Sequence, residues 1–576
     1  MLEELGELTL LDEGDPQAFR VRAYESAYHG IESFAGDLRS MTVTALTKIE
    51  GIGKSTAEKI HALLHVGTVP KLEDLRKKHP KSVVAMLKIP GVGPKAIARL
   101  RKEIGVESID DLKKAIADHK LRDMKGFGAK SEEKIEKALV RMAAFHGRTP
   151  ISVALPLAQR IVRELSAVPG VVHAEYCGSL RRFSETAGDI DVVVASKDPE
   201  PVMERAVGLS MFAEVIARGS TKTSFLTKKG IQVDVRVVEP DSIGAALLYF
   251  TGSKGHNIKL RQRALDRKMT LSEYSLAELE TGKVVASKTE EEVYAALGLP
   301  WIHPVLREDA GEIDLAEKGK LPHVMLGSDV RSDFHVHTGL SRDARGTLEE
   351  VVDMAIARGC EVLAITEHAE GLPMTGVGRD ALVEQRARLA AVQAAVGDKI
   401  SLLHGIELNI GAKGELDYDH EFRMLFDFCL ASIHDHFDLD REAQTKRVIR
   451  AMEDPSVQMI GHLSARMIGA RPGVELDMEA ILAAAERTGT ALEVNGGLPR
   501  LDVTLDVMRA ARSRDVLFVL TSDAHLASEL DRVDNAALHA SRAWVDPAHV
   551  VSTWDRKRVL DWVKKKRVNA ASIPVA

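Results

Sequence analysis

The sequence has few cysteines and no long apolar run. Three cysteines among 576 residues are too few, and odd in number, for a disulfide framework, which fits a reducing cytosol. We expect Cys177, Cys360 and Cys429 to be core residues. No stretch of about 18 uncharged apolar residues occurs, so no membrane span is expected. The acidic start MLEELGELTLLDEGD lacks the basic region and apolar core of a secretory signal. These absences predict a cytoplasmic protein.

The charge is distributed unevenly along the chain. A net charge of −7 taken alone argues against a nucleic-acid binder. Residues 41–150, however, hold 23 Lys and Arg against 13 Asp and Glu, a balance of +10, whereas residues 331–576 come to about −8. The basic region suits a polyanionic partner and the acidic half suits bound cations. Ordinary solvated surfaces explain the charges equally well.

One pattern recurs three times near the N-terminus. It reads IEGIGKSTAEKI at 49–60, IPGVGPKAIARL at 89–100 and MKGFGAKSEEKI at 124–135. Each copy is G-x-G followed by an amphipathic helix, whose free N–H groups and positive dipole end can hold a phosphate without reading a base. A single copy indicates only a tight turn, but three copies resemble helix-hairpin-helix motifs. The expected DNA-binding residues are Gly51, Gly53, Gly91, Gly93, Gly126 and Gly128.

A chain of 576 residues is long enough for several domains. After residue 150 the repeated G-x-G pattern ends. Strand-like runs alternate with helical stretches, so residues 151–240 indicate an α/β sheet unit. From 331 onward, short apolar strands such as EVLAIT and ALEVN alternate with helices. That is a βα repeat of barrel type, with polar residues at the strand ends where such barrels keep their active sites.

Three aspartates form the first catalytic constellation. Asp189 and Asp191 are two apart in the run DIDVVVAS, so their side chains point to the same face of a strand. Asp234 lies in the next strand-like run, IQVDVRVV. Three converging carboxylates repel each other unless cations sit between them, and their oxygens suit Mg²⁺ or Mn²⁺. Two such ions can activate a hydroxyl and stabilise a leaving pyrophosphate.

A Gly-Ser turn precedes these aspartates. The backbone N–H and hydroxyl of Gly178 and Ser179 can hold a phosphate, and Arg181 and Arg182 can neutralise triphosphate charge. A lone D-x-D usually marks an exposed strand edge. Here the turn comes 10–12 residues before D-x-D and a third Asp follows in a strand. This set resembles the nucleotidyltransferase superfamily.

Downstream, ALLYFTGSKGHNIKLRQRA spans residues 246–264. Together with the helix-hairpin-helix copies, it resembles the bacterial family X DNA polymerases over about residues 15–315. The resemblance implies that an aromatic pair stacks on the ribose of the incoming nucleotide while the backbone crowds its 2′ position. The residues implied in this sugar pocket are Tyr249, Phe250, Thr251 and Gly252. Ser253, Asn257 and Arg261 are further expected contacts to nucleotide or template, or else part of a capped basic surface helix.

Family X enzymes often carry an N-terminal lyase domain. In them a Lys on the helix of the first hairpin attacks an abasic sugar as a Schiff base, and Lys59 falls at the matching place. Such chemistry needs a neutral Lys. Plain phosphate binding by Lys59 remains an equal alternative.

The C-terminal part holds 11 of the 21 histidines, many at strand ends. The segments SDFHVHTGLSRD, AITEH, HGIELN, ASIHDH, IGHLS and LTSDAH resemble the polymerase and histidinol phosphatase (PHP) domain, a distorted βα barrel that holds up to three metal ions. A cluster of imidazoles and carboxylates suits Mn²⁺ or Zn²⁺. The ligands implied by the resemblance are His335, His337, Asp343, His368, Glu407, His434, His462, Asp523 and His525.

Two positions depart from the PHP pattern. The family usually has T-D-H where this chain has Thr366-Glu367-His368. It usually has S-D-G where this chain has Ser341-Arg342-Asp343-Ala344, so the acid is displaced by one residue. The other ligands are complete, which favours an active site over a relic.

The expected fold is multidomain. It comprises a helical helix-hairpin-helix region, an α+β nucleotidyltransferase palm and thumb, and a C-terminal distorted β/α barrel. The expected boundaries are 1–80 for an N-terminal helical domain, 81–150 for helical fingers, 151–240 for the palm, 241–315 for the thumb, 316–330 for a linker and 331–576 for the PHP domain.

The expected function is DNA-directed synthesis across short gaps in repair, including base excision repair. A metal-dependent 3′→5′ exonuclease or phosphoesterase in the PHP domain accompanies it. Gapped or primer–template DNA and deoxynucleoside triphosphates are the expected partners, for a cytoplasmic, nucleoid-associated monomer. Two alternatives stay open: a PHP nuclease for 3′ ends or abasic sites that the front half delivers to DNA, and a non-catalytic scaffold that binds DNA ends.

Overall fold

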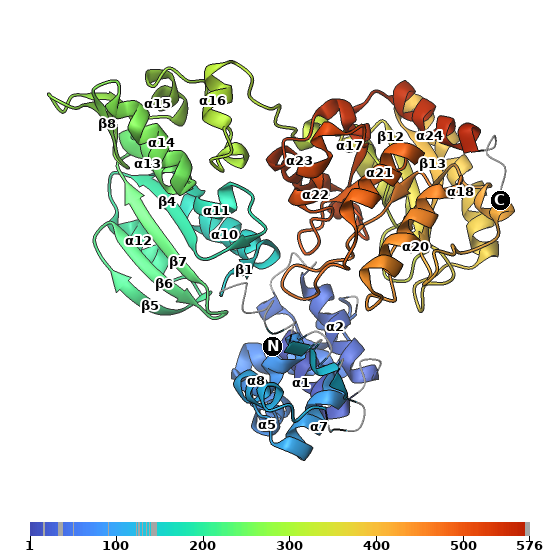
Figure 1. Ribbon diagram of the computed structural model, residues 1–576. Coiled ribbons are helices and arrows are strands. Elements are labelled where there is room, and N and C mark those ends of the chain that lie inside the picture. Colours follow the sequence, from blue (N-terminus) through green and yellow to red (C-terminus); the bar gives the residue numbers. More distant parts are fainter. Residues whose placement is uncertain are drawn as a thin grey trace. The chain divides into compact units, whose positions relative to one another are not determined.

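The computed structural model describes residues 1–570 apart from 15–17, 33–37, 50, 90–91, 123, 125–126, 130, 134, 137–138 and 140–146. The chain divides into two compact units, Met1–Gly147 and Arg148–Ala576 (Figure 1). Within the described residues, no helix is both long and apolar enough to cross a membrane.

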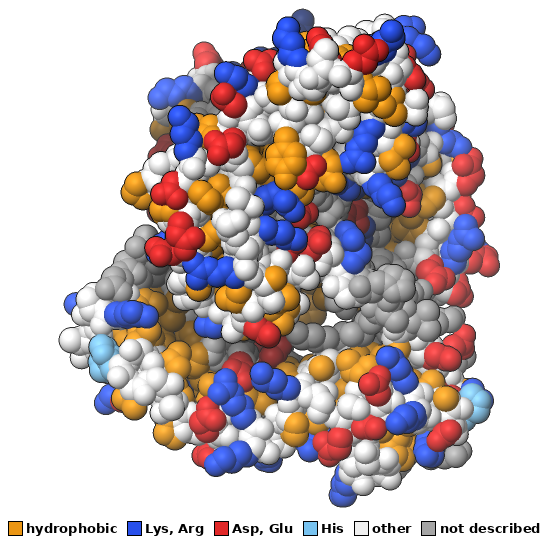
Figure 2. All heavy atoms as spheres, turned by 90° about the vertical axis from the view of Figure 1, so that its left-hand side faces the viewer, with side chains coloured by type: hydrophobic (Ala, Val, Ile, Leu, Met, Phe, Trp, Pro, Cys, Tyr) orange, Lys and Arg blue, Asp and Glu red, His pale blue; other side chains and the backbone are white. Residues whose placement is uncertain are grey.

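The first unit is helical, as the segments between the G-x-G copies predict. It buries two apolar clusters, one around Leu46 and Ile60 and the other around Leu100 and Leu112. Figure 2 shows Lys and Arg side chains interspersed with acidic ones over the face it draws. The helices are α1 (Leu2–Glu13), α2 (Phe19–Glu32), α3 (Val43–Leu46), α4 (Lys54–Val66), α5 (Pro70–Lys78), α6 (Lys81–Ala85), α7 (Pro94–Ile104) and α8 (Ile109–Ala117).

The second unit begins with a five-stranded sheet in the order β2-β4-β7-β6-β5. Only β4 and β7 are parallel neighbours in it; the other pairs are antiparallel. Helices α10 (Ile151–Ser166) and α12 (Glu200–Val207) cover the face that carries Val192 and Val194. The strands are β2 (Val171–Tyr176), β4 (Ile190–Ser196), β5 (Phe212–Arg218), β6 (Lys222–Thr227) and β7 (Gln232–Val238).

The opposite face of this sheet carries Val193 and packs against α13 (Ile243–Thr251). Because side chains alternate along a strand, Asp191 lies on this same face. The chain continues through α14 (Lys254–Leu265), the small antiparallel sheet of β8 (Met269–Leu271), β9 (Leu276–Glu278) and β10 (Val284–Ala286), and then α15 (Glu290–Ala296) and α16 (Glu312–Glu317). Helix α16 overlaps the segment expected to be a linker, so that segment is in part helical.

Seven parallel strands follow one another in chain order, β11 to β17, which confirms the predicted βα repeat. A bridge between Val336 and Ala524 links the two ends of the sheet. Strand residues buried on both faces explain the apolar runs in the sequence. The strands are β11 (Ser332–Asp333), β12 (Val362–His368), β13 (Ser401–Asn409), β14 (Phe428–Ser432), β15 (Met459–Ile460), β16 (Ala491–Asn495) and β17 (Phe518–Thr521).

Helices alternate with these strands, as Figure 1 shows for the yellow to red part of the chain. Each helix supplies apolar side chains to the core between helix and sheet, for example Val448 from α20 and Leu482 from α21. The helices are α17 (Leu348–Ala357), α18 (Arg379–Val396), α19 (His420–Arg423), α20 (Arg441–Glu453), α21 (Met478–Thr488), α22 (Leu505–Ala510), α23 (Arg532–Arg542) and α24 (Arg556–Ala570).

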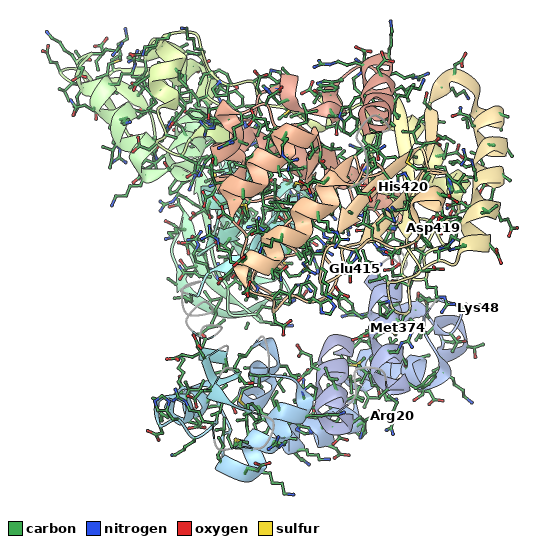
Figure 3. The ribbon with its side chains drawn as sticks, turned by 45° about the vertical axis from the view of Figure 1, so that its right-hand side comes forward. Arg20, Lys48, Met374, Glu415, Asp419 and His420 are labelled. Carbon is green, nitrogen blue, oxygen red and sulfur yellow. The ribbon has the colours of Figure 1, made fainter. Side chains whose placement is uncertain are left out.

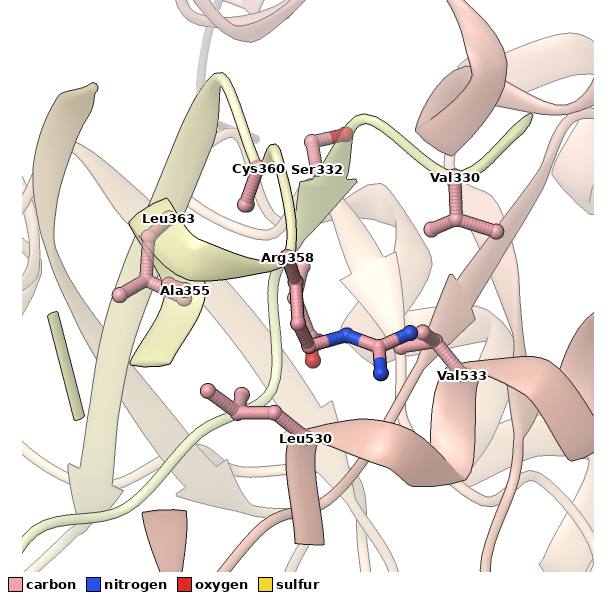
Figure 4. Close-up of a pocket in the computed structure, with 9 residues that line it drawn as sticks. Val330, Ser332, Ala355, Arg358, Cys360, Leu363, Leu530 and Val533 are labelled. Atoms are coloured by element: carbon pink, nitrogen blue, oxygen red, sulfur yellow. The ribbon is translucent and has the colours of Figure 1, made fainter. Parts of the chain in front are cut away.

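All three cysteines are free thiols, as predicted. Cys177 and Cys429 are buried, and Cys360 is half-buried. Burial raises the pKa of Cys360 to about 12, so its thiol is protonated at neutral pH. Cys360 lines a small pocket beside β11, which Figure 4 shows with Val330, Ser332, Ala355, Arg358, Leu363, Leu530 and Val533. The mostly apolar lining indicates a packing gap in the barrel wall.

Candidate active sites

The three predicted aspartates lie on neighbouring strands of the first sheet. Asp191 on β4 is directly opposite Asp234 on β7, and Asp189 immediately precedes β4 rather than lying within it. Burial, followed by the charges of Asp189 and Asp234, raises the pKa of Asp191 to about 6. Carboxylates this close repel each other, and bound cations would relieve the repulsion. The donor set, all carboxylate oxygen, fits Mg²⁺ or Mn²⁺.

The Gly-Ser turn lies directly against Asp191. Gly178 begins the short helix α11 (Gly178–Arg181) with φ of 61°, which favours glycine. A Cβ atom at this position would come within 3.0 Å of Oδ2 of Asp191. The N–H of Cys177 also donates to the carbonyl of Asp191 over 2.8 Å. Only glycine lets this backbone approach the aspartates so closely.

Asp234 is held by two neighbours. Nζ of Lys222 lies 2.7 Å from its Oδ2, and Nε2 of Gln232 donates to its Oδ1 over 3.1 Å. Burial alone would raise the pKa of Asp234, but the hydrogen bonds from Lys222 and Gln232 outweigh burial and lower it. Asp234 is therefore ionised at neutral pH, ready to bind a cation.

The end of α13 and the start of α14 carry five of the residues expected at the nucleotide. Tyr249 and Phe250 meet edge to face, with ring centroids 5.0 Å apart. The guanidinium of Arg261 lies 5.1 Å from the ring centre of Tyr249. Nδ2 of Asn257 donates to the carbonyl of Tyr249 over 2.7 Å, and Oγ of Ser253 accepts from the N–H of His256 at the start of α14. The structure thus brings these five residues together, and their roles toward a nucleotide stay a prediction.

Nine predicted metal ligands converge at the carboxyl ends of the barrel strands. Glu407 lies near the carboxyl end of β13, is fully buried, and is surrounded by the other predicted ligands. Figure 3 labels Met374 on the loop after β12, Glu415 and Asp419 on the loop after β13, and His420 at the start of α19. The imidazole nitrogens lie near the two Glu407 oxygens at 3.3 Å for His335, 3.7 Å for His337, 2.7 Å for His368, 3.2 Å for His434 and 3.1 Å for His462.

The remaining acids join the same cluster. Oδ1 of Asp523 lies 3.5 Å from Nε2 of His335 and 3.6 Å from Nε2 of His337. Oδ2 of Asp343 lies 3.2 Å from Nε2 of His368 and 3.7 Å from Nε2 of His525. The displaced acid of the S-R-D-A segment therefore still reaches the cluster, because the loop brings Asp343 beside His368.

This cluster fits divalent metal ions. Nε2 of His335, Nε2 of His337 and Oε2 of Glu407 are buried. Other candidate ligand atoms lie 2.7–3.7 Å from them, but none forms a hydrogen bond of normal geometry with a described residue. Unpartnered buried polar atoms are costly unless a ligand satisfies them. The ligand atoms form four overlapping groups of three, and within each group the atoms lie within 4.8 Å of one another. The groups are His337 with His368 and His525, His335 with His337 and Glu407, His335 with His462 and Asp523, and His368 with Glu407 and His434.

Family models match both halves of the chain. Residues 148–239 match the DNA polymerase beta palm, 246–308 the DNA polymerase beta thumb and 333–497 the PHP domain. Residues 1–69 match a helix-hairpin-helix domain and 83–140 a SAM-like helix-hairpin-helix tandem. The predicted architecture of hairpins, palm, thumb and PHP barrel is confirmed. The PHP match ends before Asp523 and His525, which the structure adds to the cluster through β17.

Full-length similarity decides the family. "DNA polymerase/3'-5' exonuclease PolX" of Bacillus subtilis (strain 168) is 34% identical over 551 residues, which cover 95% of each chain. The chain belongs to the PHP-bearing bacterial family X DNA polymerases. A "Probable phosphatase" of Shewanella amazonensis is 29% identical over 40% of this chain and 86% of its own length. That relative is similar to a smaller part of this polymerase.

Arg181 and Arg182 are paired with carboxylates. Arg181 makes two hydrogen bonds of 2.9 Å to Glu290 and another to Oγ1 of Thr251. Arg182 donates to Glu308 over 2.9 Å and to the carbonyl of Thr251 over 2.6 Å. Both guanidiniums thus brace the Thr251 segment, and their predicted contact with the triphosphate stays a prediction.

Glu367 explains one departure from the PHP pattern. Its buried carboxylate accepts hydrogen bonds from Thr338, Ser341 and Gln385. Glu367 therefore anchors the loop that leads to Asp343. Glu is one methylene longer than Asp, and this length lets the carboxylate of Glu367 reach that loop.

Three further residues escaped sequence reasoning. Oε1 of Glu493 lies 2.5 Å from Nδ1 of His335, and Oδ1 of Asn409 lies 2.6 Å from Nδ1 of His434. Nε of Arg500 lies 3.6 Å from Oδ2 of Asp523, while its Nη1 is buried with no hydrogen-bond partner among the described residues. The only signal in the sequence was that Glu493 and Asn409 are polar residues within apolar strands.

Lys59 lies on α4 beside the first hairpin. Its Nζ donates to Oγ of Ser55 over 2.7 Å and lies 5.7 Å from the ring centre of Tyr24. Partial burial lowers the pKa of Lys59, and the charges of Lys71 and Arg20 act in the same direction. These residues line one pocket with Lys54 and Arg22. A lowered pKa suits a nucleophile and the basic lining suits a phosphate, so both predictions for Lys59 stay open.

The first G-x-G turn depends on its glycines. Gly51 has φ of 78°, and a Cβ atom there would lie 2.5 Å from the carbonyl oxygen of Ser26. Gly53 and Gly93 are the N-cap residues of α4 and α7 and leave the first N–H groups of each helix without a side-chain cap. Gly128 accepts from the N–H of Glu132 in the third copy. Gly91 and Gly126 lie outside the described residues.

Proposed function

We propose that this polymerase fills short gaps in DNA during repair and trims or repairs 3′ ends with its PHP barrel. The chain is a DNA polymerase and a 3′→5′ exonuclease. The observation that carries the proposal is the presence of two separate clusters of candidate metal ligands in one chain: Asp191 beside Asp234 in the palm, and the histidines and acids around Glu407 in the barrel. The first suits nucleotidyl transfer and the second suits phosphodiester hydrolysis.

In the palm, Asp189, Asp191 and Asp234 would hold two divalent ions. Ions held here would supply Lewis-acid activation of the primer 3′-hydroxyl and neutralise charge on the leaving pyrophosphate. The turn at Gly178 and Ser179 offers backbone N–H groups and a hydroxyl to the triphosphate at short range. Tyr249 and Phe250 would stack on the sugar while the Thr251–Gly252 backbone excludes a 2′-hydroxyl.

In the barrel, the nine converging residues would hold up to three ions. Ions held here would lower the pKa of a bound water and neutralise charge on the scissile phosphate. Glu493 and Asn409 fix the ring orientations of His335 and His434 through the other ring nitrogen. We propose that the unpartnered Nη1 of Arg500 donates to a phosphate oxygen of the DNA 3′ end.

Both centres use divalent metals. We propose Mg²⁺ or Mn²⁺ in the palm, from its all-oxygen donors, and Mn²⁺ or Zn²⁺ in the barrel, from its imidazoles. DNA and deoxynucleoside triphosphates are the substrates, with gapped or primer–template DNA as the preferred form. A monomeric state and a cytoplasmic, nucleoid-associated location stay predictions.

A gapped primer–template tests the two activities separately. The wild type, Asp191→Ala and the double variant His335→Ala/His337→Ala would be assayed first with Mg²⁺ and then with Mn²⁺. Loss of a metal ligand costs several kcal/mol of transition-state stabilisation, so each variant should lose about a thousandfold in its own activity and keep the other.

Three outcomes would contradict the assignment. Primer extension by Asp191→Ala would remove the palm triad from synthesis. Unchanged degradation by the double variant would remove the barrel from hydrolysis. A wild type that binds gapped DNA but neither extends nor degrades it would instead support a scaffold.

A further inference from the structure

The PHP barrel and the palm and thumb contact each other within the second unit through two ion pairs. Arg466 of the barrel forms two hydrogen bonds, of 2.9 and 3.0 Å, to the carboxylate of Glu185 in the palm. Arg542, the last residue of α23, donates to Glu308 over 2.9 Å and to Oγ of Ser184 over 3.1 Å. Apolar contact accompanies them, since Leu501 and Trp544 of the barrel join the core of the palm.

The Arg542 pair continues into the nucleotide pocket. The same oxygen of Glu308 that accepts from Arg542 also accepts from Nε of Arg182 over 2.9 Å. Nη1 of Arg182 in turn donates to the carbonyl of Thr251 over 2.6 Å. Arg542, Glu308 and Arg182 therefore form a chain of alternating charge, and it ends on the backbone expected to exclude a 2′-hydroxyl.

The three charged side chains, Arg542, Glu308 and Arg182, are largely shielded from water. The side chains of Arg542 and Arg182 are 10% and 14% exposed, and that of Glu308 is 23% exposed. Burial would raise the pKa of Glu308, but the charges of Arg542 and Arg182 outweigh it and lower the pKa. Charged hydrogen bonds that are largely buried are strong and directional, so each link fixes the next.

The ion pair between Arg466 and Glu185 is not connected to the nucleotide pocket. Glu185 is held by Arg466, with Nε2 of His539 4.0 Å away, and both partners belong to the barrel. Arg466 and Arg542 thus join the same two parts of the molecule, but only Arg542 is linked to Thr251. This difference separates simple docking from an effect on the nucleotide pocket.

We infer that Arg542 of the PHP barrel is a positioning residue for DNA synthesis: through Glu308 and Arg182 it fixes the Thr251–Gly252 backbone against the sugar of the incoming nucleotide. The inference rests on the proposed role of that backbone in the polymerase. It makes the barrel a structural part of the sugar-selecting pocket as well as the nuclease.

Full-length Arg542→Met, Arg542→Lys and Arg466→Met would be compared with the wild type in single-nucleotide gap filling. Loss of one charged hydrogen bond should raise KM for the deoxynucleoside triphosphate about tenfold in Arg542→Met. The kcat should change less, and the preference for deoxyribose over ribose should fall. Arg542→Lys should restore part of the KM and part of the sugar preference, whereas Arg466→Met should leave the KM and the sugar preference unchanged.

Glu308→Gln provides a second route if Arg542→Met does not fold, and it should show the same changes in KM and sugar preference. Exonuclease activity on a single-stranded 3′ end reports that the barrel is intact in every variant. Unchanged KM and sugar preference in both Arg542→Met and Glu308→Gln would overturn the inference. Equal changes in Arg466→Met would also overturn it, in favour of general docking. A wild type without nucleotide incorporation would instead refute the proposed function itself.

Discussion

At the scale of single residues, the geometry of the barrel cluster depends on the candidate metal ligands and also on the side chains that orient them. Glu493 is fully buried and accepts from Oγ1 of Thr521 over 2.6 Å as well as from the N–H of His462, besides its contact with Nδ1 of His335. A carboxylate at Nδ1 fixes the tautomer and orientation of the ring and leaves Nε2 free to bind metal.

We predict that Glu493→Gln weakens metal binding in the barrel by about 10–100-fold, as is usual for a partner of a ligand. Exonuclease activity measured against Mn²⁺ concentration should shift to higher concentration, and gap filling should stay unchanged. Glu486→Gln is the matched control, because Glu486 is an exposed acid of the same domain. An unshifted Mn²⁺ curve for Glu493→Gln would remove Glu493 from the metal centre.

At the scale of elements, the first turn of α15 links the thumb to the palm. Glu290 is buried and accepts from Arg181 over 2.9 Å and from the fully buried Arg307 over 2.6 Å. Burial would raise the pKa of Glu290, but Arg307 and Arg181 outweigh it and lower the pKa to about 2. Removing one partner of such a group leaves buried charge uncompensated.

We predict that Glu290→Gln lowers the free energy of unfolding by about 3–5 kcal/mol at neutral pH, measured by urea denaturation. A carboxylate with a lowered pKa stabilises the fold fully above its unfolded value of 4.5, and this stabilisation is lost as the pH falls toward about 2. The difference between variant and wild type should therefore shrink across that window. The exposed neighbour Glu291→Gln is the control, and a difference that did not depend on pH would contradict the account.

At the scale of the whole molecule, one chain holds two candidate metal centres of different donor chemistry. Three carboxylates make up the palm set, whereas six of the nine barrel residues are histidines. Because imidazole nitrogens are softer donors than carboxylate oxygens and favour Mn²⁺ and Zn²⁺ over Mg²⁺, the two centres should respond differently to the same ion.

We predict that chelation removes both activities and that Mg²⁺ alone restores synthesis, whereas exonuclease activity returns only with Mn²⁺ or Zn²⁺. Binding to the folded state should also raise the melting temperature of the metal-free protein by about 5 °C at saturating Mn²⁺, measured by calorimetry. The double variant His335→Ala/His337→Ala should lose most of that rise. Equal recovery of exonuclease activity with Mg²⁺ would show that the barrel does not select by donor type.

Much of this molecule follows from local patterns in the sequence. Period and spacing predict the α/β sheet unit with its aspartates and the βα barrel repeat, because they fix which residues share a face or an edge. The resemblance of D-x-D with a later Asp and of the repeated G-x-G to known families implies the palm and the hairpins. The resemblance to the PHP domain implied the nine candidate metal ligands, and the structure brings all of them together.

Contacts between distant segments were decided by the tertiary structure alone. The sequence could not show that Arg182 pairs with Glu308, that Glu367 holds a loop, or that Glu493 orients His335, since these partners are 26 to 158 positions apart. The sequence by itself determined which chemistry the chain carries, because that depends on residue types at short spacing. Only folding decided which side chains brace that chemistry, because packing and charge pairing form across the whole second unit.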